Sequence, residues 1–321
     1  MHAAVVTSFT EPPRYQPFDD PVAHGPHEEV VSVLAAGLHP RVRSGADGSH
    51  YTSTGDLPVI PGIDGVARTA AGELVYFVAL DSRWGSMAQR TVIDRRRTVA
   101  LAPDADVTTI AAAMNPAMSS WVALRRRIRF SPGQSVLVLG ATGSAGQMAV
   151  QIARHLGASL VIAAGRDAAR LALLSTLGAD DTVSLHGAEE AVDEALGRAA
   201  ATVDLVIDYT WGAPTERALP AILTRRPDPA HPLTWLQIGS VAGPAIALRS
   251  AWLRAARVEI VGSGQGSVPT AAIVAELAEL AREIAAGTFA VAPVPMPLSE
   301  VRAAWDATPA AGERVVLTVE A

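Results

Sequence analysis

One segment, SVLVLGATGSAGQMAVQIARHLGA (135–158), constrains the fold of this chain more than any other. It begins with an apolar run typical of a buried strand, continues through a glycine-rich turn and ends in an amphipathic helical pattern. A strand that leads through such a turn into a helix is typical of a βαβ unit that binds phosphate. Gly143 would let the backbone approach a pyrophosphate, and Gly146 would let the helix pack closely on the strand.

The turn departs from the usual spacing of glycines, because Ala141 stands at the first glycine position and Gly140 directly precedes it. We nevertheless expect the whole turn to contact a dinucleotide, through Ala141, Thr142, Gly143, Ser144, Ala145 and Gly146. The alternative is an ordinary strand-to-helix turn of some other α/β protein. The segments that follow favour the dinucleotide, because apolar runs continue to alternate with helical patterns as far as residue 263.

This alternation predicts about six parallel strands, the number in a complete dinucleotide-binding sheet. The first third of the chain instead has short β-rich runs bounded by turn residues, and the last part ends in the strand-like GERVVLTV (312–319). We therefore predict an α/β fold in which a doubly wound parallel Rossmann sheet is inserted in a mainly β catalytic domain. The expected boundaries are 1–118 for the first catalytic part, 119–264 for the Rossmann domain and 265–321 for the second catalytic part.

The end of the second predicted Rossmann strand indicates which cofactor is used. An acidic residue there would bind the ribose 2′-hydroxyl of NADH and repel a 2′-phosphate, but the sequence reads Ala164, Gly165, Arg166. Asp167 is better explained as the N-cap of the next helix. Arg166 therefore predicts NADPH, with Gly165 beside it and Arg170 as a second candidate. The alternative for both arginines is a solvated position on the surface.

Composition excludes several mechanisms. The chain has no Cys and no Lys, so it can form no disulfide, thiolate nucleophile, cysteine zinc site, Schiff base or P-loop lysine contact. Its net charge is −6, and acidic and basic residues are interspersed along the chain, which argues against nucleic acid as a partner. No apolar run is long enough for a membrane span, and the N-terminus lacks the pattern of a secretory signal. We expect a protein of the cytoplasm whose partner is a small-molecule substrate.

The segments GATGSAGQMAVQIARHLGA, AAGLHPRVRSG, PVIPGIDGVA, NPAMSSWVAL, VDLVIDYTWG and LQIGSVAG occur in an order that resembles the zinc-independent medium-chain dehydrogenase/reductase family, and within it the quinone oxidoreductases. The likeness spans nearly the whole chain and implies a GroES-like catalytic domain. Zinc-bearing members bind the metal through Cys, His and Cys. The matching positions here read His39, Ile63 and Asn115, so the resemblance implies no zinc, because a catalytic site needs about three protein ligands.

The same resemblance implies that the nicotinamide binds between the domains. The residues expected near it are Asn115, Trp211, Gly239, Ser240, Ser263 and Gly264, although several suit a turn equally well through backbone shape. Tyr51 and Asn115 are the candidate catalytic residues, and His39 is a candidate substrate contact. A homodimer is expected, because the strand at 257–263 would leave an open sheet edge that the family commonly pairs.

The predicted reaction is transfer of hydride from NADPH to a quinone or an α,β-unsaturated carbonyl. Two alternatives stay open: a pathway-specific enoyl reductase that acts on a thioester or natural-product intermediate, and a non-catalytic NADPH-binding protein.

Overall fold

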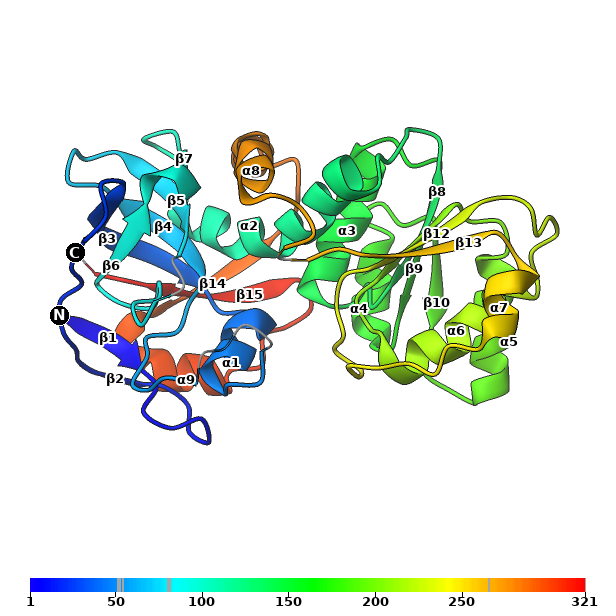
Figure 1. Ribbon diagram of the computed structural model, residues 1–321, viewed down its shortest axis with the longest axis horizontal. Coiled ribbons are helices and arrows are strands. Elements are labelled where there is room, and N and C mark those ends of the chain that lie inside the picture. Colours follow the sequence, from blue (N-terminus) through cyan, green and yellow to red (C-terminus); the bar gives the residue numbers. More distant parts are fainter. Residues whose placement is uncertain (51–52, 54, 80–81, 265, 321) are drawn as a thin grey trace. The chain divides into compact units, whose positions relative to one another are not determined.

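The computed structural model describes residues 1–50, 53, 55–79, 82–264 and 266–320. The chain forms two units, Met1–Asn115 with Thr270–Ala321 and Pro116–Pro269. Helix α2 (Val107–Val122) is labelled in Figure 1. The first division falls inside this helix, between Asn115 and Pro116. The predicted domain boundaries, after residues 118 and 264, stay a prediction.

The second unit alternates strands with helices. Its elements are the π-helical turn η2 (Ala123–Arg127), β8 (Ser135–Leu139), α3 (Ser144–His155), β9 (Leu160–Gly165), α4 (Ala168–Leu174), β10 (Asp181–Ser184), α5 (Glu189–Ala199), β11 (Leu205–Asp208), α6 (Gly212–Leu223), β12 (Leu233–Gln237), α7 (Ser250–Ala255) and β13 (Val258–Gly262). This pattern agrees with the order of strands and helices that the sequence predicts.

The six strands of this unit form one parallel sheet in the order β10-β9-β8-β11-β12-β13. The chain moves outward from β8 through β9 to β10, and then returns to place β11 on the other side of β8. The direction of winding therefore reverses between β8 and β11, which is where sheets of this kind bind ligands at the carboxyl ends of their strands. The predicted doubly wound sheet is confirmed.

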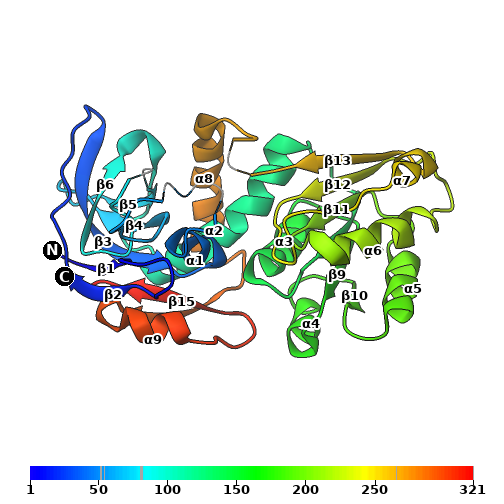
Figure 2. The ribbon, with the colours of Figure 1, turned by 60° about the horizontal axis from the view of Figure 1, so that its bottom comes forward.

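Apolar strands and amphipathic helices hold this sheet together. The β8 residues Val136 to Leu139 have no exposed surface, as expected for a strand covered on both faces. α3 packs on β8 and β9, and α5 lies beside α6 (Figure 2). Apolar side chains of α5 and α6, among them Leu196, Leu219 and Ile222, complete a core with β8, β9, β11 and β12.

The first unit is mainly β. Its elements are β1 (His2–Val5), β2 (Arg14–Pro17), β3 (Glu28–Gly37), α1 (Pro40–Ala46), β4 (Asp64–Arg68), β5 (Leu74–Val78), β6 (Arg90–Asp94), the 3₁₀ turn η1 (Arg95–Arg97), β7 (Thr98–Ala100), the first part of α2, α8 (Thr270–Ala285), β14 (Ala292–Pro297), the 3₁₀ turn η3 (Leu298–Glu300), α9 (Val301–Asp306) and β15 (Glu313–Thr318). Its larger sheet has the order β14-β15-β3-β4-β5-β7, with β6 also paired to β3.

The two ends of the chain meet in this unit. β15 pairs antiparallel with β3, with Val316 opposite Gly37. Leu317 of β15 and Leu298 of η3 join Ala4 of β1 in one apolar core. The C-terminal segment therefore completes the N-terminal β structure, as the sequence predicts. Among the described residues, no helix is both long and apolar enough to cross a membrane.

Candidate cofactor-binding site

The glycine-rich turn lies at the carboxyl end of β8. Gly140 has a φ of +83°, a conformation that suits glycine, and its amide donates to the Ala164 carbonyl of β9 at 3.0 Å. A Cβ at Gly146 would lie 2.3 Å from the Gly140 oxygen and 2.6 Å from Cα of Ala141. The first turn of α3 therefore packs directly on the backbone of the turn, as the sequence predicts for Gly146.

The start of α3 fits a phosphate group. Gly143 is its N-cap, and none of the side chains that the structure describes caps the helix there. The first amides of a helix have no partner inside it, and the helix dipole adds partial positive charge at the same end. Among the described residues, a Cβ at Gly143 would have the Gly140 oxygen, 3.6 Å away, as its sole neighbour within 4 Å, so there is room for a ligand beside the backbone. The amides of Ser144 and Ala145 would hold the pyrophosphate of a dinucleotide.

Two arginines follow β9 and differ in their surroundings. Arg166 is exposed, and within the described part of the chain it has no hydrogen bond or ion pair. Arg170 is half-buried; its Nε lies 3.5 Å from the Asp167 carboxylate. Asp167 accepts a hydrogen bond from the Arg170 amide and is the N-cap of α4, which confirms the prediction for this residue. Arg166 is thus the better placed of the two to meet a 2′-phosphate.

Gly165, at the end of β9, leaves space that the side chain of Thr142 in the glycine-rich turn occupies. A Cβ at Gly165 would lie 2.4 Å from Cγ2 of Thr142 and 2.8 Å from its hydroxyl. The Thr142 carbonyl in turn accepts a hydrogen bond from the Gln147 side chain at 3.2 Å. Thr142 therefore fills the space above the end of β9 and fixes the turn relative to the residues that follow that strand.

The other predicted contacts in this unit lie at the ends of the next three strands. Trp211 follows β11 and has a φ of +50°. Gly239 follows β12, and a Cβ there would lie 2.8 Å from the Tyr209 carbonyl oxygen; Ser240, next to it, is exposed. Ser263 follows β13 and donates its amide to Gln237, while the Gly264 amide donates to Ser267. Because all strands are parallel, these residues share one edge of the sheet with the turn. Their contact with cofactor stays a prediction.

His39, the predicted substrate contact, is buried in the first unit. Its Nε2 lies 3.0 Å from Oδ1 of Asp64, and the two side chains are 2% and 1% exposed. Tyr76 donates its hydroxyl to the other Asp64 oxygen at 2.9 Å. Burial lowers the pKa of His39, although Asp64 opposes the shift. His39 is therefore neutral and donates from Nε2, and its Nδ1 has no partner within the described residues.

Arg314 of β15 completes this buried group of His39, Asp64, Tyr76 and Arg314. It is 5% exposed, and burial lowers its pKa to about 10. The sequence analysis missed Asp64, Tyr76 and Arg314, because they come from three separate strands. A charged residue inside an apolar run, such as Arg314 in GERVVLTV, is the signal that could have identified it.

The two candidate catalytic residues are Asn115 and Tyr51. Asn115 is half-buried in α2, directly before Pro116. Tyr51 lies outside the described residues. Ile63 stands immediately before β4. Among the residues that the structure describes, no three His, Asp or Glu side chains gather in a group suited to a metal ion.

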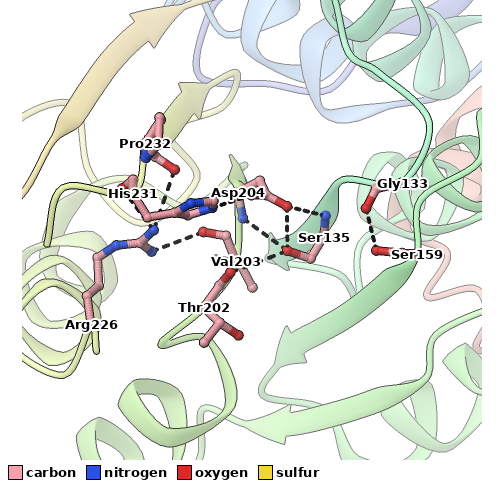
Figure 3. Close-up of polar contacts among 9 residues, drawn as sticks. All are labelled: Gly133, Ser135, Ser159, Thr202, Val203, Asp204, Arg226, His231 and Pro232. Carbon is pink, nitrogen blue, oxygen red and sulfur yellow. Dashed lines mark hydrogen bonds and ion pairs between the residues drawn. The ribbon is translucent and has the colours of Figure 1, made fainter. Parts of the chain in front are cut away.

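A second polar group lies at the opposite, amino-terminal edge of the parallel sheet. Asp204, directly before β11, lies between His231 and Ser135 (Figure 3). Its carboxylate accepts from the amide of Ser135 at 2.7 Å and lies 2.7 Å from Nε2 of His231. The buried Arg226 donates to the carbonyls of Val203 and His231. These contacts hold the starts of the strands together, at the edge of the sheet opposite the glycine-rich turn.

The similarity to known proteins agrees with this geometry. Residues 145–225 match the family model described as zinc-binding dehydrogenase. The chain is 30% identical to a probable NADPH-dependent quinone reductase of Emericella nidulans, over 99% of both chains. It is also 29% identical to a 2-methylene-furan-3-one reductase of Solanum lycopersicum, over 47% of this chain and 43% of the relative.

Solved structures share the fold over the whole chain. The quinone oxidoreductase of Thermus thermophilus, whose structures include a complex with NADPH, has a TM-score of 0.80 at 24% identity and covers 99% of this chain and 100% of its own. A probable oxidoreductase of Mycobacterium abscessus has a TM-score of 0.77 at 27% identity, over 99% and 98% of the two chains. With its doubly wound sheet, its β unit built from both ends of the chain and a full-length relative at 30% identity, the chain belongs to the quinone oxidoreductase-like group of the medium-chain dehydrogenase/reductase family.

Proposed function

We propose that the chain is an NADPH-dependent oxidoreductase that transfers hydride to a quinone or to the β-carbon of an α,β-unsaturated carbonyl, and that it does so without a metal ion. The observation that carries this proposal is the exposed Arg166 at the end of β9, on the same sheet edge as the uncapped start of α3. The full-length similarity to a probable NADPH-dependent quinone reductase supports it.

Groups that carry positive or partial positive charge would bind the phosphate groups of the cofactor. Amides at the start of α3 bind the pyrophosphate, and the guanidinium of Arg166 binds the 2′-phosphate. Bound NADPH supplies a hydride, and solvent supplies the proton that completes the reduction. A conjugated acceptor spreads the incoming negative charge onto an oxygen, which one or two hydrogen bonds can stabilise. Asn115 and Tyr51 are the proposed donors of these bonds, and His39 the proposed substrate contact.

Steady-state kinetics test the reaction. NADPH oxidation should occur with a quinone or an enone, whereas NADP⁺ reduction with a primary alcohol should be negligible in buffer that contains a chelator. Alcohol oxidation requires stabilisation of an alkoxide, which zinc performs as a Lewis acid in other dehydrogenases. Stoichiometric zinc on which activity depends would contradict the metal-free mechanism.

Single substitutions test the two proposed donors. Because a delocalised charge needs less help than an alkoxide, Asn115→Ala and Tyr51→Phe should each lower turnover by less than the roughly 100- to 10,000-fold effect of a general acid or base. Complete loss of turnover in either folded variant would show that the mechanism depends on one proton donor.

An enoyl thioester belongs in the same substrate panel. A trans-enoyl reductase of Aspergillus terreus is 27% identical over 68% of this chain, so a thioester substrate is the second candidate. Tight binding of NADPH with no turnover of quinone, enone or thioester would instead favour a non-catalytic binding protein.

We also propose a homodimer. β13 is an edge strand of the parallel sheet, and large apolar side chains are exposed in the segment that precedes it, with Val241 77%, Leu248 40% and Leu253 44% exposed. Pairing of two such edges would satisfy the free backbone groups and cover apolar surface. Light scattering at micromolar concentration tests this, and a clean monomer would contradict it.

The predicted cytoplasmic location is a separate proposal, which cell fractionation would test.

A further inference from the structure

Asp208, the last residue of β11, is a buried carboxylate with an unusual number of partners. It has no exposed surface. It accepts five hydrogen bonds, from the amides of Thr210 and Trp211, the hydroxyls of Thr210 and Thr215, and Nε1 of Trp235, at 2.6–3.1 Å. Within the described chain no cation pairs with it. A buried charge is tolerated when hydrogen bonds replace its water, and here all of them come from neutral donors.

Two of these bonds hold a strained stretch of backbone. Trp211 has a φ of +50°, which is unfavourable for a residue with a Cβ, and Gly212 follows with a φ of +58°. The Trp211 amide donates to Oδ1 of Asp208 at 3.1 Å, and the Thr210 amide donates to the same oxygen at 2.8 Å. Strain of this kind persists where surrounding bonds fix it, and it is common at functional sites. Asp208 supplies the bonds that fix it here.

The loop that Asp208 holds, Tyr209–Gly212, packs against the glycine-rich turn. A Cβ at Gly140 would lie 3.1 Å from Cγ2 of Thr210 and 3.2 Å from Cβ of Tyr209. On the other side the Thr210 carbonyl accepts from the Ala242 amide at 2.8 Å. The loop therefore lies between the strand ends of β8 and β12. β8 and β11 are also the strands between which the winding of the sheet reverses.

We infer that Asp208 is a positioning residue: it fixes the loop Tyr209–Gly212 against Gly140 and thereby sets the affinity of the glycine-rich turn for the dinucleotide. This inference rests on the proposed function, since it assumes that the turn binds NADPH. Asp208 itself need not touch the cofactor. If its role were merely to stabilise the fold, its loss would lower the melting temperature and leave the affinity of the folded protein unchanged.

The first test is Asp208→Asn, measured as the dissociation constant of NADPH by calorimetry on the full chain. The new amide can present its oxygen to Thr210 and Trp211, but its NH₂ then faces Nε1–H of Trp235, which can only donate. This conflict displaces the side chain, so we expect the dissociation constant to rise about tenfold. Thr210→Val, which removes one hydroxyl bond to Asp208 with little change in shape, should raise it by about threefold.

A second substitution separates positioning from stability. Trp235→Phe, added to Asp208→Asn, removes the conflicting donor and leaves a cavity in the core, because Trp235 is fully buried. We expect the double variant to recover most of its NADPH affinity while its melting temperature falls further. Opposite changes in affinity and stability cannot arise from a purely structural role.

Asp204→Asn is the matched control, since Asp204 lies at the other end of the same strand and also accepts several hydrogen bonds (Figure 3). It should lower the melting temperature and change the dissociation constant by less than about twofold. Unaltered NADPH affinity in both folded Asp208→Asn and folded Thr210→Val would overturn this inference and leave the proposed function standing. Failure of the unmodified chain to bind NADPH would overturn the proposed function, and this inference with it.

Discussion

Nε2 of His39 lies 3.0 Å from Oδ1 of Asp64, and both side chains are almost completely buried. At the position that the family resemblance matches to a metal ligand, this chain thus has a neutral imidazole held by a carboxylate. The contact places a titratable group in the core of the first unit, and it makes the stability of the protein depend on pH.

The pKa of His39 is lowered by burial from its ordinary value of 6.5. Below pH 6.5 the unfolded chain therefore takes up a proton at this residue that the folded chain resists. The free energy of unfolding should fall as the pH drops below 6.5, by up to about 1.4 kcal/mol per pH unit from this group. Urea unfolding between pH 5 and 7.5 should show a weaker pH dependence in His39→Gln, which can still donate to Asp64. His186→Gln, at an exposed position, is the control. Equal pH dependence in His39→Gln and the unmodified chain would contradict the prediction.

Arg166→Ala should remove most of the preference for NADPH over NADH. A charge-assisted contact to phosphate contributes about 1.5–3 kcal/mol, so we expect a preference of at least about tenfold in the unmodified chain. Arg170→Ala should have a smaller effect, because Arg170 also contacts Asp167. Arg198→Ala, on the exposed side of α5, is the control and should change neither dissociation constant. If Arg166→Ala kept its preference, another residue would bind the 2′-phosphate.

Two alanine substitutions should separate packing from binding in the glycine-rich turn. Gly146→Ala places a Cβ 2.3 Å from the Gly140 oxygen, so it should destabilise the protein by about 1–3 kcal/mol. Gly143→Ala places a Cβ in ordinary van der Waals contact, 3.6 Å from the Gly140 oxygen, so its melting temperature should stay close to that of the unmodified chain while NADPH binds at least about tenfold more weakly. Calorimetric melting and NADPH titration of both variants provide the measurement. A normal affinity in Gly143→Ala would show that phosphate does not approach this backbone.

Tyr209 should give the protein a second pH dependence, at alkaline pH. Its hydroxyl lies 3.0 Å from that of Ser119, and burial raises its pKa to about 12 from 10. Below pH 10 the buried phenol is neutral in both states. Between pH 10 and 12 the unfolded chain loses the proton first, so the unmodified protein should lose stability that Tyr209→Phe retains. Near pH 8 the variant should be less stable by about 0.5–1.5 kcal/mol because it lacks the hydrogen bond. Tyr15→Phe is the exposed control, and a similar alkaline loss in Tyr209→Phe would exclude this residue as the cause.

The sequence was sufficient to predict the parallel sheet and the position of the glycine-rich turn. Both depend on local patterns: a buried strand such as β8 is uniformly apolar, and Gly146 lies a fixed distance after it. Asp167 was also predictable as an N-cap, because capping involves residues within one helical turn.

The buried polar contacts could not be predicted in this way. Asp208 meets Trp235 from 27 positions away, and Arg314 joins His39 from the other end of the chain. Such pairs are set by strand order, which no local pattern specifies. The contact between His39 and Asp64 could not be predicted for the same reason, since Asp64 lies on another strand.

The packing of Thr142 on Gly165 limits how this protein could acquire a different cofactor during evolution. Enzymes that use NADH commonly have an acidic residue at the end of the second strand. Any residue larger than glycine at 165 would place its Cβ 2.4 Å from Thr142. An acidic residue at 165 would therefore require the Thr142 side chain to move or to be shortened. At position 165, a change of reductant during evolution would therefore involve Thr142 as well.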